Sequence, residues 1–314
     1  MDNAKKPLNG LTPKQNRIIT GIFDDGELQQ NITYSHSVLC QTSLPFKDMG
    51  EVREWNSRNG DALVLVEAGQ VLDPNGNGYI KIGLPYGAKP RLILNYINAQ
   101  AVKTQCREIE VENSLHAFMK ALGIEPNGRH YKSIKDQLGR LAASQIVIGR
   151  YKSNGSSTTQ YGRIVEGMNI FFSKDENQRV LWPNVIQLSK NYFESLCLHA
   201  VPLDEKSIYL LKDSALELDM YAMFAERLHR IKPGKPQFVP WSILYSQYGG
   251  GYSRIRDFRR AFLKHLLNVH AVYPDAKIEE EKGGSGQSKG LKLYHSRPPV
   301  LKKNFVVVKP QNDD

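Results

Sequence analysis

Two stretches decide the predicted fold: RHYKSIKDQLGRLAAS at residues 129–144 and SRIRDFRRAFLKHLLNV at residues 253–269. In both, apolar side chains recur at intervals of three and four, which places them on one face of a helix. The predicted core faces are Tyr131, Ile134, Leu138 and Leu141 in the first stretch, and Ile255, Phe258, Phe262, Leu266 and Val269 in the second. The opposite face of each helix is rich in cations.

The elements predicted around these helices occur in the same order twice, roughly 125 to 130 residues apart. The first copy comprises a helix at 91–102, a strand at 108–111, helices at 114–122 and 129–144, and a hairpin at 145–172; the second comprises a helix at 215–231, a strand at 237–239, helices at 240–248 and 253–269, and a hairpin at 270–296. Three helices followed by a β-hairpin are typical of a winged helix. The predicted fold is therefore α+β, with tandem winged-helix (helix-turn-helix) domains, β-hairpin wings and an N-terminal arm.

Composition and turn signals divide the chain further. Residues 1–35 are polar and are expected to form a flexible arm. Residues 36–180 hold the first winged-helix domain, preceded by a hairpin predicted between the strand ALVLVE at 62–67 and YIKI at 79–82. Residues 181–314 hold a linker, with a strand at 185–188 and a helix at 204–212, and then the second winged-helix domain.

The positive charge is concentrated in two zones. The chain has a net charge of +10, but residues 129–163 alone carry seven Lys/Arg against one Asp, and residues 226–297 carry fourteen against six acidic residues. The rest of the chain is slightly acidic. Two separate basic zones indicate a polyanion touched at two places, although a solvated charged surface would give the same count.

The cationic helix faces are the predicted DNA-reading surfaces. Arginine can pair with guanine through two hydrogen bonds, whereas lysine on phosphate adds affinity without sequence information. A solvated amphipathic helix is the alternative for each helix taken alone, and the repetition of the pattern favours DNA. The predicted contacts are Arg129, Lys132, Ser133, Lys135 and Arg140 in the first helix, and Ser253, Arg254, Arg256, Arg259, Arg260 and Lys264 in the second.

The wings add cations beside flexible tips. Phosphate or minor-groove contacts are predicted for Arg150, Lys152 and Arg163 in the first wing, and for Lys282, Lys289 and Lys292 in the second. The glycine-rich tip at 283–290 does not match a Walker A loop, because Ser288-Lys289-Gly290 leads into a strand rather than opening a helix. An ordinary surface loop is the alternative for the first wing.

No catalytic site is expected. The eight histidines are scattered and are interpreted as surface or boundary residues, and no two of them lie one residue apart as in metal-dependent nicking enzymes. Tyr245, Tyr248 and Tyr252 are interpreted as packing or phosphate contacts. The three cysteines, Cys40, Cys106 and Cys197, favour reduced thiols in a cytoplasm over disulfides or zinc. We expect a cytoplasmic, plasmid-associated bacterial protein without cofactor, metal or membrane partner.

Two motifs carry a family resemblance. The stretch CQTSLPFKD at 40–48 and the stretch GLPYGAKPRL at 83–92 resemble the RepA family of plasmid replication initiators. The likeness extends through Ser114-Leu115, Phe118, Gly128-Arg129 and Gln137-Leu138, and more loosely to the helix ending at Phe262, with a distant similarity to TrfA.

The resemblance implies a function narrower than composition can give. Members of this family bind double-stranded repeats (iterons) at the plasmid origin, help to open adjacent DNA, and recruit the host initiator and the replicative helicase. It also implies a possible homodimer through the first winged-helix domain. A tandem winged-helix repressor without initiator activity would have the same helices and wings, and an origin-nicking enzyme is the third alternative.

Overall fold

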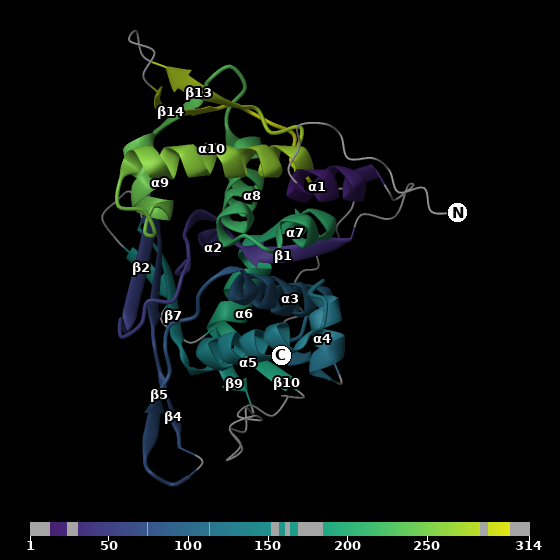
Figure 1. The fold of residues 1–314 in the computed structure, drawn as a ribbon, viewed down its shortest axis with the longest axis vertical. Coiled ribbons are helices and arrows are strands. Elements are labelled where there is room, and N and C mark those ends of the chain that lie inside the picture. The colour runs from purple at the N-terminus through teal and green to yellow at the C-terminus, as the bar shows by residue number, and fades with distance from the viewer. Residues whose placement is uncertain are drawn as a thin grey trace, which may run out of the picture.

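The computed structural model describes residues 13–23, 31–73, 75–112, 114–151, 157–160, 164–168, 185–282 and 288–301. Within these ranges the chain combines helices with several small antiparallel sheets, so the fold is α+β (Figure 1). The elements up to residue 151 are α1 (Pro13–Phe23), β1 (Ile32–His36), α2 (Ser37–Gln41), β2 (Glu54–Asn59), β3 (Ala62–Glu67), β4 (Gln70–Leu72), β5 (Tyr79–Lys81), α3 (Ala88–Thr104), β6 (Glu108–Glu110), α4 (Leu115–Ala121), α5 (Gly128–Ala143) and β7 (Gln145–Tyr151).

The later elements include a second set of three helices followed by a hairpin. They are β8 (Ser157–Gln160), β9 (Val165–Met168), β10 (Val185–Leu188), α6 (Lys190–His199), β11 (Ala200–Asp204), α7 (Glu205–Leu211), α8 (Ala215–Arg227), the 3-10 turn η2 (Leu228–Arg230), β12 (Gln237–Pro240), α9 (Trp241–Tyr248), α10 (Ile255–Val272), β13 (Ile278–Lys282) and β14 (Ser288–Leu293). The predicted helices, short strands and second hairpin of the repeated plan are therefore present, with ends that differ by a few residues.

Side-chain caps fix where the helices of the repeated plan begin. The side chain of Asn127 accepts a hydrogen bond from the backbone N–H of His130 at the start of α5, and Ser114 and Ser214 cap α4 and α8 in the same way. Such caps satisfy backbone donors that have no partner within the helix. The Asn and Ser residues in the sequence thus set the positions of these helices.

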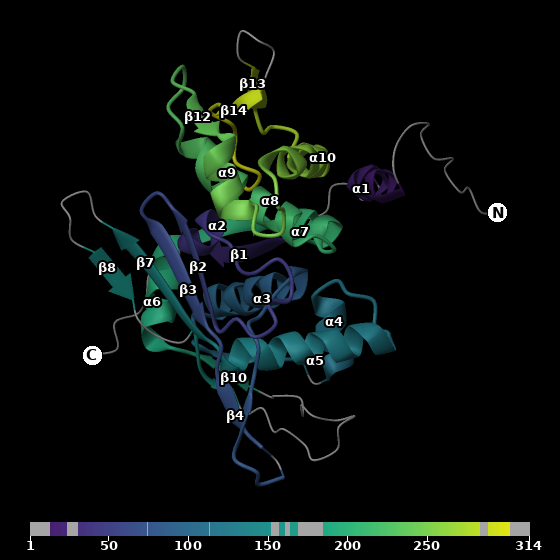
Figure 2. The same ribbon diagram turned by 60° about the vertical axis from the view of Figure 1, so that its left-hand side comes forward.

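Four of the helices form a stack through the body of the molecule. Helix α10 packs on α8, α8 packs on α3, and α3 packs on α5, and both views show this order (Figures 1 and 2). Helix α8 is buried along almost its whole length, as its sequence LELDMYAMFAE between Leu216 and Glu226 shows. The two cationic helices, α5 and α10, are consequently separated by two central helices.

The predicted first hairpin differs from the structure. Strand β3, the ALVLVE stretch, pairs with β2 and β7 and lies inside the four-stranded sheet β2-β3-β7-β8, whereas the turn at residues 73–78 joins the short strands β4 and β5. Ala62, Val64 and Val66 on one face of β3 are fully buried. The alternation of β3 was visible in the sequence, but the three-residue strand β4 is too short to give a signal.

The hairpin predicted at 145–172 is also organised differently. Strand β7 pairs with β8 on one side and with β3 on the other, while β9 pairs with β10 in a second sheet. In the second copy, by contrast, β13 pairs with β14, and β12 extends the same sheet. The second hairpin therefore matches the expected arrangement more closely than the first.

Residues 13–23 and 32–36 form elements in the range expected to be an arm. Helix α1 packs on α10 and α7, with Ile18 fully buried, and β1 pairs with β11 over five residues. The partners of both elements lie more than 160 residues away in sequence, so local composition could not reveal them. The contacts of α1 with α7 and α10, and the pairing of β1 with β11, also cross the domain boundary predicted at residue 180.

Candidate nucleic-acid interface

Helix α10 exposes its cations on one side of the molecule. Ser253, Arg254, Arg256, Arg260 and Lys264 are exposed and Arg259 is half-buried. The Asp257 carboxylate accepts a hydrogen bond from Arg254 Nε at 2.7 Å and lies 3.5 Å from Arg260 Nη2. Within the described part of the chain, Arg256, Arg259 and Lys264 have no ion pair or side-chain hydrogen bond. Three cations of α10 are thus available to an external polyanion.

An aromatic core holds this helix in place. Phe258 and Phe262 are fully buried, and Phe262 lies edge-on to Trp241 of α9 with ring centroids 5.6 Å apart. Tyr245 and Tyr252 pack against Phe258 at 5.6 and 5.7 Å. Edge-to-face pairs add to the stability gained from burial, so the exposed side of α10 is presented by a well-packed base. Tyr248 is also buried, with its ring centroid 6.1 Å from that of Phe262, so all three tyrosines interpreted as packing or phosphate contacts pack in the core.

The turn between α9 and α10 is tight. The hydroxyl of Tyr245 donates to the carbonyl of Tyr252 at 2.6 Å, and the amide of Tyr252 donates to the carbonyl of Gly249 at 2.9 Å. A Cβ at Gly249 would lie 2.4 Å from the Tyr245 carbonyl oxygen, so only glycine fits there. Gly249 therefore lets the chain turn closely over Tyr245 at the end of α9.

One residue of the predicted core face of α10 was assigned wrongly. Ile255 is 43% exposed, whereas Phe258, Phe262 and Val269 are fully buried and Leu266 is half-buried. Ile255 is the first residue of α10, where the helix has not yet reached the packed layer beneath it. Helical periodicity alone does not show where a helix enters the core.

The second hairpin has a mixed charge. Lys282 and Lys289 are exposed on either side of its tip, and residues 283–287 lie outside the described ranges. Lys292 is half-buried, and its ammonium lies 3.8 Å from the Glu281 carboxylate. Strand β13 reads IEEEK, so its three consecutive glutamates lower the positive potential of the hairpin. Of the three predicted lysines, Lys292 alone has an anionic partner among the described residues.

The predicted DNA-contacting residues of helix α5 differ in their surroundings. Arg129 and Lys132 are exposed, and Ser133 and Lys135 are half-buried. Arg140 is only 16% exposed: its Nε lies 3.0 Å from both oxygens of Asp136, and its Nη1 donates to the carbonyl of Leu84 at 3.1 Å. Its guanidinium also covers the ring of Tyr86 at 5.0 Å. Arg140 thus fastens the GLPYG segment to α5.

The remaining predicted contacts lie on or beyond β7. Arg150 ion-pairs with Asp61 at 3.0 Å and donates to Ser37 Oγ at 3.2 Å. Lys152 and Arg163 lie outside the described residues. The structure therefore brings the six residues of α10 and its preceding turn together, and places those of α5 on a separate helix beyond α8 and α3.

The interpretation of all eight histidines as surface or boundary residues was wrong for His36. This side chain is 2% exposed, its Nε2 lies 3.0 Å from Ser195 Oγ, and its Nδ1 accepts from the backbone N–H of Val38 as the cap of α2. Burial, together with the nearby His199 and Arg150, lowers the pKa of His36 to about 3. His36 is therefore neutral and structural. Within the described ranges, no group of three or more His, Cys, Asp or Glu residues is arranged to hold a metal ion.

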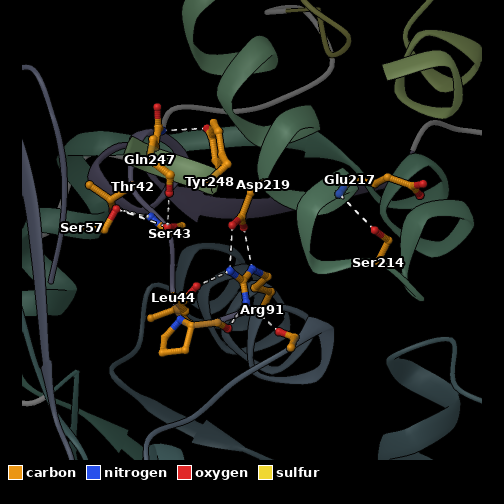
Figure 3. Close-up of polar contacts among 12 residues, drawn as sticks. Thr42, Ser43, Leu44, Ser57, Arg91, Ser214, Glu217, Asp219, Gln247 and Tyr248 are labelled. Carbon is orange, nitrogen blue, oxygen red and sulfur yellow. Dashed lines mark hydrogen bonds and ion pairs between the residues drawn. The ribbon is translucent and has the colours of Figure 1, made fainter. Parts of the chain in front are cut away.

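Sequence reasoning missed the polar residues that join the two halves. Figure 3 shows Arg91 of α3 facing Asp219 of α8, with the segment at residues 42–44 and Gln247 of α9 close by. Arg91 lies within the GLPYGAKPRL motif, so the motif itself was the available signal. Its partner 128 positions away could not be read from the sequence.

A known protein family matches the middle of the chain. A family model described as plasmid encoded RepA protein matches residues 84–242, slightly more than half of the chain. The chain belongs to this RepA family. The family is one of plasmid replication initiators, which confirms the resemblance carried by the two motifs. The match runs from Leu84 through α3, α5 and α8 into α9, and α10 lies beyond it. No curated protein gives a significant sequence match to this RepA family member.

Solved structures show a similar fold. Domains 2 and 3 of RctB, solved as selenomethionine derivatives, superpose with a TM-score of 0.51 at 12% identity, covering 84% of this chain and 96% of that chain. A second structure of RctB domains 2–3 gives a TM-score of 0.51 at 11% identity, covering 83% and 97% of the two chains. At these identities the likeness concerns the fold alone. In the described part of this RepA family member, no helix combines the length and the apolar character needed to cross a bilayer.

Proposed function

We propose that this RepA family member initiates plasmid replication by binding repeated double-stranded sequences (iterons) at the origin through two winged-helix units. The units are α3, α4 and α5 with the β7–β8 hairpin, and α8, α9 and α10 with the β13–β14 hairpin. Binding would promote opening of adjacent DNA and recruit the host initiator and the replicative helicase. The chain would contribute no catalytic step and need no cofactor, and its place would be the plasmid in the bacterial cytoplasm. Membership of an initiator family supports the general role.

The observation that carries the proposal is the exposed cationic side of α10. Arg256, Arg260 and Lys264 recur every four residues, so they project from the same side of the helix over about two turns. The buried aromatic residues beneath them fix the orientation of that side. An α-helix fits the major groove of DNA, where an arginine can form two hydrogen bonds with guanine. Arg256, which has no intramolecular partner among the described residues, is the best candidate for reading a base.

The surrounding residues suit phosphate contact. Arg254 lies at the start of α10 and is 66% exposed, and Lys282 and Lys289 flank the tip of the hairpin. Contacts to phosphate position a protein on DNA and make its affinity depend on salt. In the first unit, Arg129, Lys132 and Lys135 are proposed to make equivalent contacts, whereas Arg140 is committed to Leu84 and Asp136. Two units inserted one helical turn apart would cover about 20 base pairs.

A competition binding assay tests the proposal. The full-length protein is incubated at physiological salt with a repeat-bearing origin fragment of its own replicon, against scrambled DNA of the same length. A preference of about a thousandfold or more is expected of a specific DNA-binding protein. Equal and steeply salt-dependent affinity for both fragments would reduce the cationic surfaces to a general polyanion site and contradict iteron recognition.

Two further assays separate the alternatives. Permanganate footprinting of the origin detects unpaired thymines, so reactivity that depends on the protein supports initiation, whereas specific binding without reactivity indicates a repressor. Relaxation of a supercoiled origin plasmid by the protein alone would identify a nicking enzyme. Sedimentation of the free and DNA-bound protein tests the proposed homodimer through the first unit.

A further inference from the structure

The guanidinium of Arg91 uses all of its hydrogen-bonding capacity within the protein. Its Nε donates to Asp219 Oδ1 at 2.6 Å and its Nη2 to Asp219 Oδ2 at 2.7 Å, a bidentate ion pair. Its Nη2 also donates to the carbonyl of Leu44 at 2.8 Å, and its Nη1 donates to the carbonyls of Gly87 and Pro45 at 2.7 and 3.3 Å (Figure 3). A guanidinium has five N–H groups. All five are engaged, and the side chain is only 7% exposed.

Arg91 and Asp219 meet at the centre of the helix stack. Arg91 belongs to α3, which packs on α5, and Asp219 belongs to α8, which packs on α10. The relative position of α5 and α10 therefore depends on how α3 meets α8. The Arg91–Asp219 pair lies in that contact, with one partner from each half of the repeated plan.

The segment at residues 41–46 is hydrogen-bonded both to Arg91 and to helix α9. Ser43 Oγ donates to the carbonyl of Gln247 at 3.0 Å, and the side chain of Gln247 donates to the carbonyl of Gln41. Gln247 lies in the last turn of α9, two residues before Gly249. The same segment supplies Leu44 and Pro45 to Arg91, so one short stretch binds both α3 and α9.

The chemistry of the contact favours a fixed geometry. The hydrophobic effect is non-directional, whereas bidentate and charge-assisted hydrogen bonds require defined distances and angles. A cavity of about 40 Å³, lined in part by Arg91, Asp219, Thr42, Ser43 and Asn95, lies beside the pair. The contact is thus held by directional polar bonds in addition to apolar packing, because Leu94 of α3 and Leu218 and Ala222 of α8 are buried and line the same cavity.

We propose that the Arg91–Asp219 pair sets the spacing on DNA at which α5 and α10 can bind together, which makes Arg91 a positioning residue for spacing specificity. The inference rests on the proposed function, because it requires both helices to contact one duplex. Inserting one base pair moves the two contact sites apart by about 3.4 Å and rotates them by roughly 35°. A rigid protein must lose affinity for such a site, whereas a protein with a loosened joint can follow the displacement.

The test measures how much affinity is lost when the spacing of the DNA site is altered. This loss, the spacing penalty, is compared between variants in place of the affinity itself. Footprinting of the wild type first locates the centre of the protected repeat, and fragments with two base pairs inserted or deleted there are then used as probes. We expect the wild type to bind the altered fragments about a hundredfold more weakly than the native repeat, since mismatched recognition costs this order of magnitude. Arg91→Lys keeps the positive charge but cannot form the bidentate pair with Asp219. Its spacing penalty is expected to shrink to about tenfold or less.

Arg53→Lys is the matched control. Arg53 donates to the carbonyls of Ile82, Ala68 and Gly69 at 2.6 to 2.7 Å, so it is also a multiply bonded arginine, but all of its partners lie in the first half. Its replacement is expected to lower the melting temperature and to leave the spacing penalty unchanged. Asp219→Asn, which has nearly the same shape as the native residue, provides a second route if Arg91→Lys fails to fold.

The outcomes are distinct. A spacing penalty that is unchanged in folded Arg91→Lys and Asp219→Asn, or that changes equally in Arg53→Lys, overturns the inference while iteron binding stands. A wild type that discriminates repeat from scrambled DNA but tolerates both altered spacings overturns it as well. A wild type without any preference for the repeat contradicts the proposed function itself, and the inference falls with it.

Discussion

Lys14 of α1 and Glu217 of α8 are separated by 203 positions in the sequence, yet their side chains form an ion pair of 2.5 Å. The Glu217 carboxylate is fully buried and also lies 2.8 Å from His265 Nδ1 and 2.7 Å from Asn268 Nδ2, both on α10. One buried carboxylate therefore fastens α1 and α10 to α8. Burial acts to raise the pKa of Glu217, but the hydrogen bonds from His265, Lys14 and Asn268 outweigh it and hold the pKa below its ordinary value.

The first prediction concerns the acid stability that Glu217 provides. Because its pKa is lower in the folded than in the unfolded state, its contribution is complete above the unfolded pKa of about 4.3 and is lost as the pH falls through the folded pKa. Glu217→Gln is expected to reduce the free energy of unfolding at pH 7 by about 3 kcal/mol, the order found when a buried ion pair loses one partner. Urea unfolding at pH 6 and pH 3.5 should show a smaller pH dependence in the variant.

Glu194→Gln is the control for this measurement, since in the described part of the chain Glu194 forms a single ion pair, an exposed one of 3.8 Å with Lys190 of α6. Exposed pairs of this kind contribute less than about 1 kcal/mol. Equal pH dependence in wild type and Glu217→Gln would show that the buried carboxylate does not contribute to acid stability.

The second prediction concerns His36. Its pKa of about 3 in the folded state lies below the unfolded value of about 6.5, so protonation favours the unfolded chain and stability falls as the pH drops below 6.5. Between pH 7.5 and pH 5 this group alone should cost on the order of 2 kcal/mol. His36→Asn, which keeps a side-chain acceptor for the α2 cap, is expected to remove that slope. Thermal unfolding at both pH values measures it.

Replacement of an exposed histidine, His270→Asn, should leave the slope as in the wild type. The prediction for His36 fails if its variant retains the full loss of stability between the two pH values.

The third prediction separates base reading from phosphate contact. Arg256→Ala should weaken binding to the origin repeat by about 1–3 kcal/mol, the value of a good bidentate pair, and should weaken binding to random duplex much less. Lys289→Ala should weaken both by a similar factor and reduce the slope of log affinity against log salt by about one. Fluorescence anisotropy at several salt concentrations measures both effects, and far-ultraviolet spectra should match the wild type. Equal losses on the two DNAs for Arg256→Ala would remove Arg256 from base recognition.

The fourth prediction follows from the acidic strand β13. Glu281 lies 3.8 Å from the ammonium of Lys292, so Glu281→Gln frees this lysine and removes one negative charge from the hairpin. Affinity for repeat and random DNA should rise together, and the salt slope should steepen by up to about one. Lys292→Ala should have little effect in the wild type and a larger effect in the Glu281→Gln background. Unchanged affinity in Glu281→Gln would show that this face of the hairpin does not approach DNA.

Local periodicity predicted the parts of the fold that are locally determined. The order of helices in both copies, the strand at 62–67 and the buried faces of α5 and α10 could be found because amphipathic spacing and capping residues are properties of a short stretch. Helix α6 and the β1–β11 pair could not be found in this way. Pairing of β1 with β11 joins residues about 170 positions apart, and nothing in either strand specifies its partner.

In the candidate site, too, locally determined features could be predicted and long-range contacts could not. The cations of α10 were predicted because they alternate with a buried face, and they are exposed. The roles of Arg150 and Lys292 could not be predicted, because their carboxylate partners Asp61 and Glu281 become neighbours only through packing or strand pairing. For Arg140, the i,i+4 pair with Asp136 could be read from the sequence, but the contacts with Leu84 and Asp48 could not. A cation count from sequence therefore overestimates the charge available to DNA.

Glu217 and Asp219 are two residues apart on α8, so their side chains point about 200° away from each other around the helix. One carboxylate anchors Lys14 and His265 on one side, and the other anchors Arg91 on the opposite side. This arrangement limits how chimeras of related initiators can be built. A hybrid joined at residue 213 would take α8 from one parent and residues 14 and 91 from the other. Unless both parents carry the same cations, each side of α8 would then bury a carboxylate lacking its counter-ion, and the hybrid would unfold before its DNA specificity could be measured.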